Sequence, residues 1–119
     1  MTYIQSFVLA VPTANKDAYS KMAADAWPMF KGYGALSMQE NWGVDVAKGK
    51  QTDFYRATNA KDDETIVSSW IVWPDKETCD AAAEKMQSDS SMQDMEMPFD
   101  GMRMFWGGFE PLFKSDHER

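Results

Sequence analysis

Four segments of the chain have the apolar patterns and residue types of β-strands. Residues 3–11 open the pattern, and residues 65–73 show it most clearly because β-branched and aromatic side chains dominate them. Residues 36–46 and 102–113 predict the other two strands. The first and third of these strands are largely apolar on both faces. In the first strand one face carries Tyr3, Gln5, Phe7, Leu9 and Val11, and the other carries Ile4, Ser6, Val8 and Ala10.

Two other segments repeat apolar residues every three or four positions, which predicts amphipathic helices. The first runs from a cap at Thr13 or Asn15 to about Lys31, with a kink expected at Pro28. The second begins after Asp75, a residue type that commonly caps helices. The predicted buried stripes are Tyr19, Met22, Ala26, Met29 and Tyr33 in the first helix, and Cys79, Ala82, Ala83 and Met86 in the second.

The order of the elements predicts the fold class. Residues 52–60, capped by Thr52, and residues 88–95 add only short helical turns. The long elements follow the order β-α-β-β-α-β, which predicts an α+β, ferredoxin-like antiparallel sheet with both helices on one face. We expect a single domain over residues 1–113 and a polar C-terminal tail over residues 114–119.

The apolar residues on the second face of this sheet must also be buried against something. A sheet with one solvated face alternates apolar and polar residues, whereas the first and third strands here are apolar on both sides. Two helices can cover only one of these sides. The same face of a second copy is the simplest cover for the other, so we predict a two-fold homodimer.

Composition and charge limit the classes of molecule that the protein can be expected to bind. The chain has 119 residues, of which 44% are hydrophobic and 26% charged, as in one globular domain. The net charge is −7 and no run of Lys or Arg forms a basic patch, so we expect no nucleic-acid partner. Apolar runs are too short for a membrane span, so we expect no membrane partner. The single Cys79 and an N-terminal segment unlike a signal peptide predict a cytoplasmic protein.

Three segments carry a resemblance to a known family: GALSMQENWGVDVAKGKQTDF, SWIVWPDKETCDAA and DMEMPFDGMRMFWGGFEP. Together they resemble a bacterial family catalogued as domain of unknown function 1428, which is related to YbaA-like proteins. The resemblance covers nearly the whole chain. It implies the dimeric α/β-barrel version of the ferredoxin-like fold and no established activity. The wider fold group includes cofactor-independent monooxygenases, haem-degrading proteins, dye peroxidases and small-molecule binders, among which the fold does not choose.

Two glutamates are candidate catalytic residues. Glu40 shares a strand face with Met38 and Trp42, and Glu110 shares one with Trp106. A carboxylate on an apolar face has a raised pKa unless it is paired, and can then act as a proton acceptor. The alternative is a position at a strand end, or an ion pair with an arginine.

Five residues are candidate ligand contacts. Trp42, Trp70 and Trp106 could line an apolar pocket for a ring-shaped ligand. Arg56 or Arg103 could hold a ligand carboxylate through a guanidinium fork. Core packing would explain the tryptophans equally well, and Arg103 could instead brace a turn through a neighbouring aspartate.

The remaining signals point away from metals. The only histidine, His117, lies in the tail, and Cys79 lies on a buried helix stripe, so we predict no metal and no cofactor. Closely spaced methionines such as Met92 and Met95 suit Cu(I), but methionine also fills irregular cores.

Two adjacent glycines, Gly107 and Gly108, lie inside the last predicted strand. Glycine at such a position predicts a close approach to the backbone, either by a neighbouring sheet or by a ligand.

Two functions from different classes follow. The first is a cytoplasmic homodimer that binds a small, partly aromatic or acidic molecule in an aromatic-lined pocket. The second is a cofactor-independent monooxygenase- or isomerase-like enzyme in which Glu40 or Glu110 accepts a proton in a dry cavity.

Overall fold

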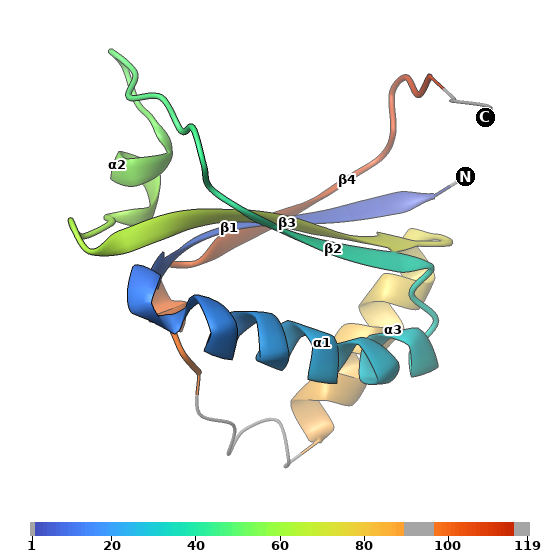
Figure 1. Cartoon of the computed structure of the whole chain (residues 1–119). Helices are drawn as coiled ribbons and strands as arrows, with labels where there is room; N and C mark the ends of the chain where they lie inside the picture. Colours follow the sequence, from blue (N-terminus) through green and yellow to red (C-terminus); the bar gives the residue numbers. More distant parts are fainter. Residues whose placement is uncertain (1, 90–96, 116–119) are drawn as a thin grey trace.

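The computed structural model describes residues 2–89 and 97–115. Four antiparallel strands form one sheet in the order β2-β3-β1-β4, and two long helices cover one of its faces (Figure 1). The predicted element order and the one-sided helices are confirmed. The strands are β1 Tyr3–Pro12, β2 Ser37–Trp42, β3 Glu64–Trp73 and β4 Phe105–Phe109; the helices are α1 Lys16–Gly32, the short α2 Phe54–Thr58, and α3 Lys76–Ser88.

The pairing register decides which side chains face the helices. Phe7 of β1 lies opposite Ser69 of β3 and Trp106 of β4, and Glu40 of β2 lies opposite the same Ser69. Side chains along each strand point alternately to the two faces of the sheet, so these four residues lie on the same face, which α1 and α3 cover. We call this the helix face and the other one the open face.

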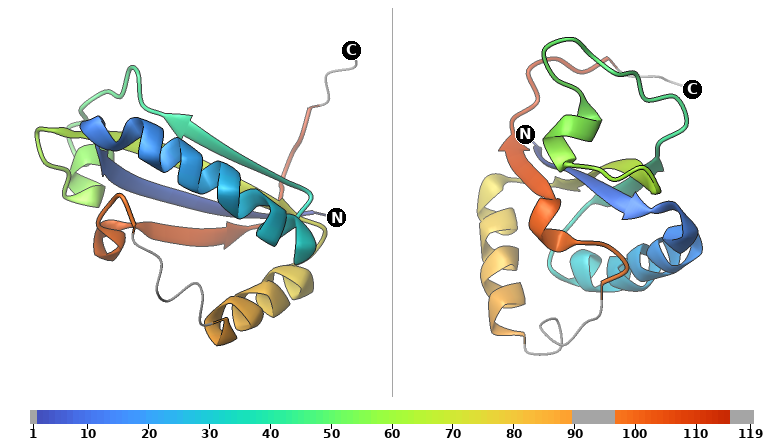
Figure 2. Two further views of the ribbon diagram at one scale, coloured as in Figure 1. Left: turned by 60° about the horizontal axis from the view of Figure 1, so that its bottom comes forward. Right: turned by 90° about the vertical axis from the view of Figure 1, so that its left-hand side faces the viewer.

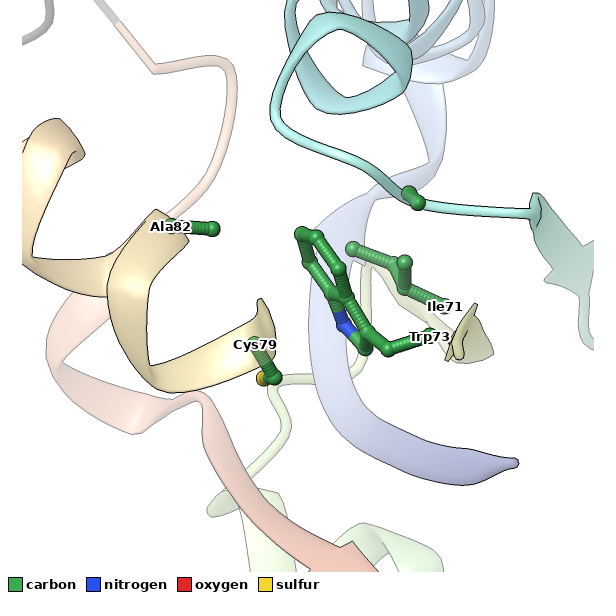
Figure 3. Close-up of a cluster of buried hydrophobic side chains, with 5 residues drawn as sticks. Ile71, Trp73, Cys79 and Ala82 are labelled. Atoms are coloured by element: carbon green, nitrogen blue, oxygen red, sulfur yellow. The ribbon is translucent and has the colours of Figure 1, made fainter. Parts of the chain in front are cut away.

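The core under α3 is closely packed around one tryptophan. Trp73 is completely buried, and Figure 3 shows it between Ile71 of its own strand and Cys79 and Ala82 of α3. Its indole N–H donates a 3.1 Å hydrogen bond to Oε1 of Gln5 on β1. The polar atom of the largest buried side chain is therefore satisfied, as a buried indole requires.

A second apolar cluster lies under α1. Its fully buried members are Leu9, Val11, Tyr19 and Val67. Partly buried side chains surround them, among them Met22, Trp42, Phe99 and Met104. The predicted stripe of α1 therefore faces the sheet, with Tyr19 buried and the residues after it partly buried. In the predicted stripe of α3, Cys79 and Ala82 are buried, but the prediction of Ala83 as a buried residue was wrong because its side chain is exposed.

Two aspartates cap the helices that follow loops. Asp75 accepts a 2.7 Å hydrogen bond from the backbone N–H of Thr78, which confirms the predicted cap of α3. Asp53 accepts a 2.8 Å bond from the N–H of Arg56 and caps α2. The prediction of Thr52 as that cap was wrong by one residue. None of the helices in residues 2–89 and 97–115 is long and apolar enough to cross a membrane.

Several predicted boundaries were wrong. A short 3-10 turn, η1 Thr13–Asn15, precedes α1, and β2 ends at Trp42 rather than near residue 46. The last strand covers only five residues, because the 3-10 turn η2 Gly101–Arg103 occupies its predicted start. Its predicted end leaves the sheet, so that Leu112 and Phe113 are exposed. Most of the turn predicted at residues 88–95 lies outside the described residues.

The close approach at the glycines of β4 comes from side chains of the same sheet. A Cβ atom on Gly108 would collide with the phenol of Tyr3, which lies across β4 on the helix face. A Cβ on Gly107 would lie 3.2 Å from the ring of Phe109. A side chain at position 108 would therefore require the phenol of Tyr3 to move, without any ligand or second sheet being involved.

The open face of the sheet is largely apolar. Short α2 lies over one end of it, and the chain beyond β4 rises on the same side at the other end (Figure 1). Between them the open face carries partly buried or exposed apolar side chains from three strands: Ile4, Val8, Trp70, Val72, Phe105 and Phe109. The expectation that the first and third strands are largely apolar on both faces is confirmed.

Candidate functional site

A cavity of about 250 Å³ lies between α1 and the helix face of the sheet. Strands β1, β2 and β3 form its floor, and α1 and residues 97–104 form its walls. Four aromatic and five methionine side chains contribute most of the lining: Phe7, Tyr19, Phe30 and Phe99, with Met22, Met29, Met38, Met97 and Met104. The cavity reaches the surface at Asp25, whose side chain is 59% exposed.

Three polar side chains meet in this apolar lining. The hydroxyl of Tyr19 on α1 donates a 2.7 Å hydrogen bond to Oε1 of Glu40 on β2. The Ser69 side chain on β3 also forms a hydrogen bond with Glu40. Because β2 and β3 pair Glu40 with Ser69 and the stripe of α1 carries Tyr19 over them, the fold itself assembles this trio.

The surroundings of Glu40 act on its pKa in opposite directions. Packing of protein around the carboxyl raises the pKa of Glu40 above its ordinary value, and this effect exceeds the lowering by the hydrogen bonds from Tyr19 and Ser69. Burial, followed by the nearby Glu40 charge, raises the pKa of Tyr19, so that the phenol stays protonated and remains a donor. Tyr19 therefore holds the Glu40 carboxyl in place as a hydrogen-bond donor, and this carboxyl binds a proton more readily than an exposed glutamate does.

The other acid at the cavity is already neutralised. Asp25 forms a 2.7 Å ion pair with Lys21, one turn earlier on α1. Within residues 2–89 and 97–115, Glu40 forms no ion pair, and no Lys or Arg lines the cavity. No group of three His, Cys, Asp or Glu side chains suited to a metal ion occurs in the same ranges, and His117 lies outside them.

Tyr19 and Glu40 also line a smaller cleft on the outer side of the cavity. This outer cleft has a volume of about 160 Å³ and includes Lys16 and Trp42. The ammonium of Lys16 lies 5.6 Å from the centroid of the Trp42 ring, in a cation–π arrangement. The Tyr19–Glu40 pair thus stands between the interior cavity and a surface cleft.

Polar contacts hold the wall formed by residues 97–104. The guanidinium of Arg103 forms two hydrogen bonds with Glu64 at the start of β3, at 2.7 and 2.6 Å, and another with Asp100 at 3.1 Å. The amide of Asn15 donates to the carbonyl of Pro98 at 2.9 Å. Phe99 meets the ring of Tyr19 edge-on, with 5.6 Å between the centroids. Figure 2 shows η2 at the same end of the sheet as the start of α1.

The structure separates most of the predicted ligand contacts. Trp42 lies in the outer cleft next to Glu40, whereas Trp70 projects from the open face. Trp106 is 60% exposed on the edge strand β4, where the centroid of its ring lies 6.4 Å from that of the Phe7 ring. Arg56 donates to the carbonyls of residues 49 and 50 and so braces its own loop. Arg103 is engaged by Glu64 and Asp100, as described above.

The two catalytic candidates also differ in position. Glu40 lies in the cavity, whereas Glu110 follows the end of β4 and is exposed. Sequence reasoning placed Tyr19 on a buried stripe and Ser69 in a strand, but it did not assign either one to a site. One signal could have identified Tyr19. Its hydroxyl lies on the otherwise apolar stripe of α1, which was predicted to face a strand that carries an unpaired acid, Glu40.

The solved structures support the fold. The chain is similar to a dimeric ferredoxin-like protein from an uncultured marine organism, with a TM-score of 0.53 and 12% sequence identity. The alignment covers 98% of this chain and 100% of that one. At this identity the similarity concerns the fold alone, and it confirms the ferredoxin-like prediction.

The sequence comparisons identify the family. The uncharacterized protein YbaA of Escherichia coli strain K12 is 52% identical over 114 residues, which cover 94% of this chain and 97% of YbaA. A YbaA protein of Shigella flexneri matches to the same extent. Residues 2–101 match the family described as "Protein of unknown function (DUF1428)". The chain therefore belongs to the DUF1428 family, as the three sequence segments predicted.

Proposed function

We propose that the protein binds a small, largely apolar organic molecule in the cavity beneath α1, with Glu40 as its main polar contact. The observation that carries this proposal is the cavity itself, about 250 Å³ in volume and lined mostly by apolar side chains, with the hydrogen-bonded carboxyl of Glu40 among them. Small-molecule sites commonly combine a concave apolar wall with a few convergent polar groups. The volume suits a ligand smaller than a typical drug, for which pockets of about 300–1,000 Å³ are usual.

The methionine side chains support an adaptable site. Met22, Met29 and Met38 line the cavity from two elements, and Met97 and Met104 from a third segment. Methionine is unbranched and polarizable, so it can follow the shape of different apolar ligands and contact aromatic rings through sulfur.

A fragment screen by ligand-observed NMR can test the binding proposal. We expect apolar fragments to bind the wild type and to lose binding in Ala26→Phe, because this change on α1 fills the cavity. Ala81→Phe places the same ring on an exposed position of α3 and is the matched control. Fragments that bind Ala26→Phe as well as the wild type would place the binding site elsewhere.

We also propose that the protein works as a homodimer in the cytoplasm. The apolar side chains of the open face and the exposed Leu112 and Phe113 beside it support burial against a second copy. The similar marine protein is described as dimeric. The single Cys79 is buried and fits a reducing compartment.

Native mass spectrometry of freshly purified protein tests this assembly. We expect a species of twice the 13.5 kDa chain mass. Trp70→Arg, in the middle of the open face, is expected to yield monomer, whereas Leu36→Arg, an exposed apolar position next to β2, is expected to leave the dimer intact. A wild type that is monomeric at micromolar concentration would contradict the proposal.

A second candidate function is proton transfer by Glu40. The observation that favours it is the raised pKa of Glu40 together with the hydrogen bond from Tyr19, because a proton acceptor works best with a pKa moved toward the working pH. The reaction would be an isomerisation or a cofactor-independent oxygenation of an activated C–H acid.

Turnover assays with the Glu40→Gln variant separate binding from catalysis. For an enzyme, Glu40→Gln is expected to abolish turnover while the variant still folds and binds the substrate. Glu110→Gln tests the other predicted acceptor in the same assay. Retained activity in Glu40→Gln would exclude this role for Glu40.

A further inference from the structure

We infer that the ligand of the cavity carries a protonated amine on a small apolar body, and that its ammonium group binds the carboxylate of Glu40. The inference rests on the binding function proposed above and narrows it to one chemical class. Its basis is the charge and the hydrogen-bonding capacity of the cavity lining.

Among the described residues, no Lys or Arg lines the cavity to offset the charge of Glu40, and the base of the adjoining outer cleft, Lys16, lies over the ring of Trp42. Asp25 is satisfied by Lys21, but Glu40 has neither an ion-pair partner nor a Lys or Arg beside it in the cavity, within the part of the chain that the structure describes. A ligand ammonium would supply the missing charge. A ligand carboxylate would instead place two like charges close together in a partly buried site.

The carboxylate of Glu40 also has acceptor sites left for a hydrogen-bond donor of the ligand. An ionised carboxylate offers about four acceptor sites. Among the residues that the structure describes, Tyr19 and Ser69 are its side-chain hydrogen-bond partners, so about two of these sites remain for a ligand. A hydroxyl could fill one of them, whereas an ammonium has three N–H donors and adds attraction between opposite charges.

The surrounding rings suit a cation. The rings of Tyr19 and Phe99 meet edge-on in the wall of the cavity. In the adjoining outer cleft the ammonium of Lys16 already lies over the ring of Trp42, two residues from Glu40 on the same strand. Aromatic faces attract cations, and the net charge of −7 raises the local concentration of cationic molecules.

The two predicted arginine contacts do not oppose this inference. An acidic ligand was expected because Arg56 or Arg103 could hold its carboxylate. Arg56 binds carbonyls of its own loop, and Arg103 is held by Glu64 and Asp100. Neither of them lines the cavity.

Three probes of nearly the same shape test the inference on the full-length protein: phenethylamine, phenethyl alcohol and phenylacetate. Their affinities can be measured at neutral pH by isothermal titration calorimetry or ligand-observed NMR. We expect the amine to bind about tenfold more tightly than the alcohol, the difference expected of one charge-assisted hydrogen bond, and phenylacetate to bind most weakly.

Two variants locate the effect. Glu40→Gln is expected to reduce the preference for the amine to less than about threefold while the alcohol still binds. Glu84→Gln removes the same charge from an exposed position on α3 and is expected to keep the preference, which separates a local contact from the net charge. Equal binding of amine and alcohol, or an unchanged preference in Glu40→Gln, would overturn the inference and leave the binding function intact. Absence of binding by all three probes would count against the binding function itself.

Discussion

The two ends of the helix face are built differently. Under α3, Trp73 fills the space between the sheet and the helix, and its neighbours Ile71, Cys79 and Ala82 are at most 6% exposed. Under α1 the same sheet borders a cavity of about 250 Å³, and residues 97–104 form a wall whose lining side chains are partly buried or exposed. We call these the packed end and the hollow end.

The difference lies in what holds each end together. Close apolar contact stabilises the packed end, where dispersion and burial act over a whole indole. Directional polar contacts frame the hollow end: Arg103 with Glu64, Asn15 with Pro98, and Tyr19 with Glu40. Hydrogen bonds and ion pairs can fix a wall at a distance without filling the space behind it, which is what a binding cavity requires.

The largest expected effect belongs to the packed end. We expect Trp73→Ala to lower the free energy of unfolding by about 4 kcal/mol, because it removes a fully buried ring and leaves Gln5 without its donor. Trp106→Ala is the matched control. Its side chain is 60% exposed, so we expect a loss of less than about 1 kcal/mol. Urea unfolding followed by circular dichroism measures both, and equal losses would remove the distinction between the two tryptophans.

The next effect tests the frame of the hollow end. Arg103 holds the pKa of Glu64 at about 2, below its ordinary value of 4.5. The side chain of Glu64 is only 3% exposed, so Glu64→Gln should leave Arg103 incompletely paired and lower the stability by about 3 kcal/mol at neutral pH.

The pH dependence of this effect has a defined sign. A lowered folded-state pKa stabilises the protein above the unfolded pKa, and this stabilisation disappears as the pH falls through the folded value. The deficit of Glu64→Gln relative to the wild type should therefore shrink between about pH 4.5 and pH 2. Urea midpoints at neutral and acidic pH measure it, and a deficit that is constant with pH would mean that the ion pair is not its cause.

A smaller effect is expected at the Tyr19–Glu40 pair. Tyr19→Phe removes one hydrogen bond to a partly solvated acceptor, and we expect a loss of about 1 kcal/mol. Because that bond lowers the pKa of Glu40, its removal should raise the pKa of Glu40 further. An NMR titration of the Glu40 carboxyl carbon measures the change, and an unchanged or lower pKa would show that Tyr19 does not act on the carboxylate.

The smallest effect on stability is expected from Glu40→Gln. The pKa of Glu40 is raised in the folded state, so its favourable contribution is complete below the unfolded pKa and is lost as the pH rises through the folded value. Glu40→Gln should therefore equal or slightly exceed the wild type in melting temperature at neutral pH, and the difference should vanish below about pH 4. Differential scanning calorimetry across this range measures it. A marked loss of stability at neutral pH would make Glu40 a structural residue rather than a functional one.

Local patterns accounted for most of the fold. The strand and helix periods are properties of neighbouring residues, and they placed Trp73 in a strand and Cys79 and Ala82 on a buried stripe before any tertiary contact was considered. The boundaries were less predictable because competing turn chemistry decides them. Asp53 rather than Thr52 caps α2, and the 3-10 turn η2, capped by Asp100, occupies the predicted start of β4.

The candidate site depended on pairings that a sequence does not specify. Glu40 was predicted as a functional acid because it lies among apolar residues on its strand, and the structure places it in the cavity. Its partner Tyr19 lies 21 positions away, and the partner of Arg103 lies 39 positions away. With 19 acidic residues in the chain, nothing local indicated that Arg103 would bind Glu64 rather than a ligand.

The strand order has a consequence for how the protein is made. β1 lies in the sheet between β3 and β4, and β4 follows the other three strands of the sheet in the chain, so one edge of β1 stays unpaired until β4 is synthesised. Until residues 105–109 emerge, the backbone groups along that edge are open to pairing with other chains. The preceding residues bring Phe99 and Met104, so the wall of the cavity cannot close before residues 97–104 are synthesised.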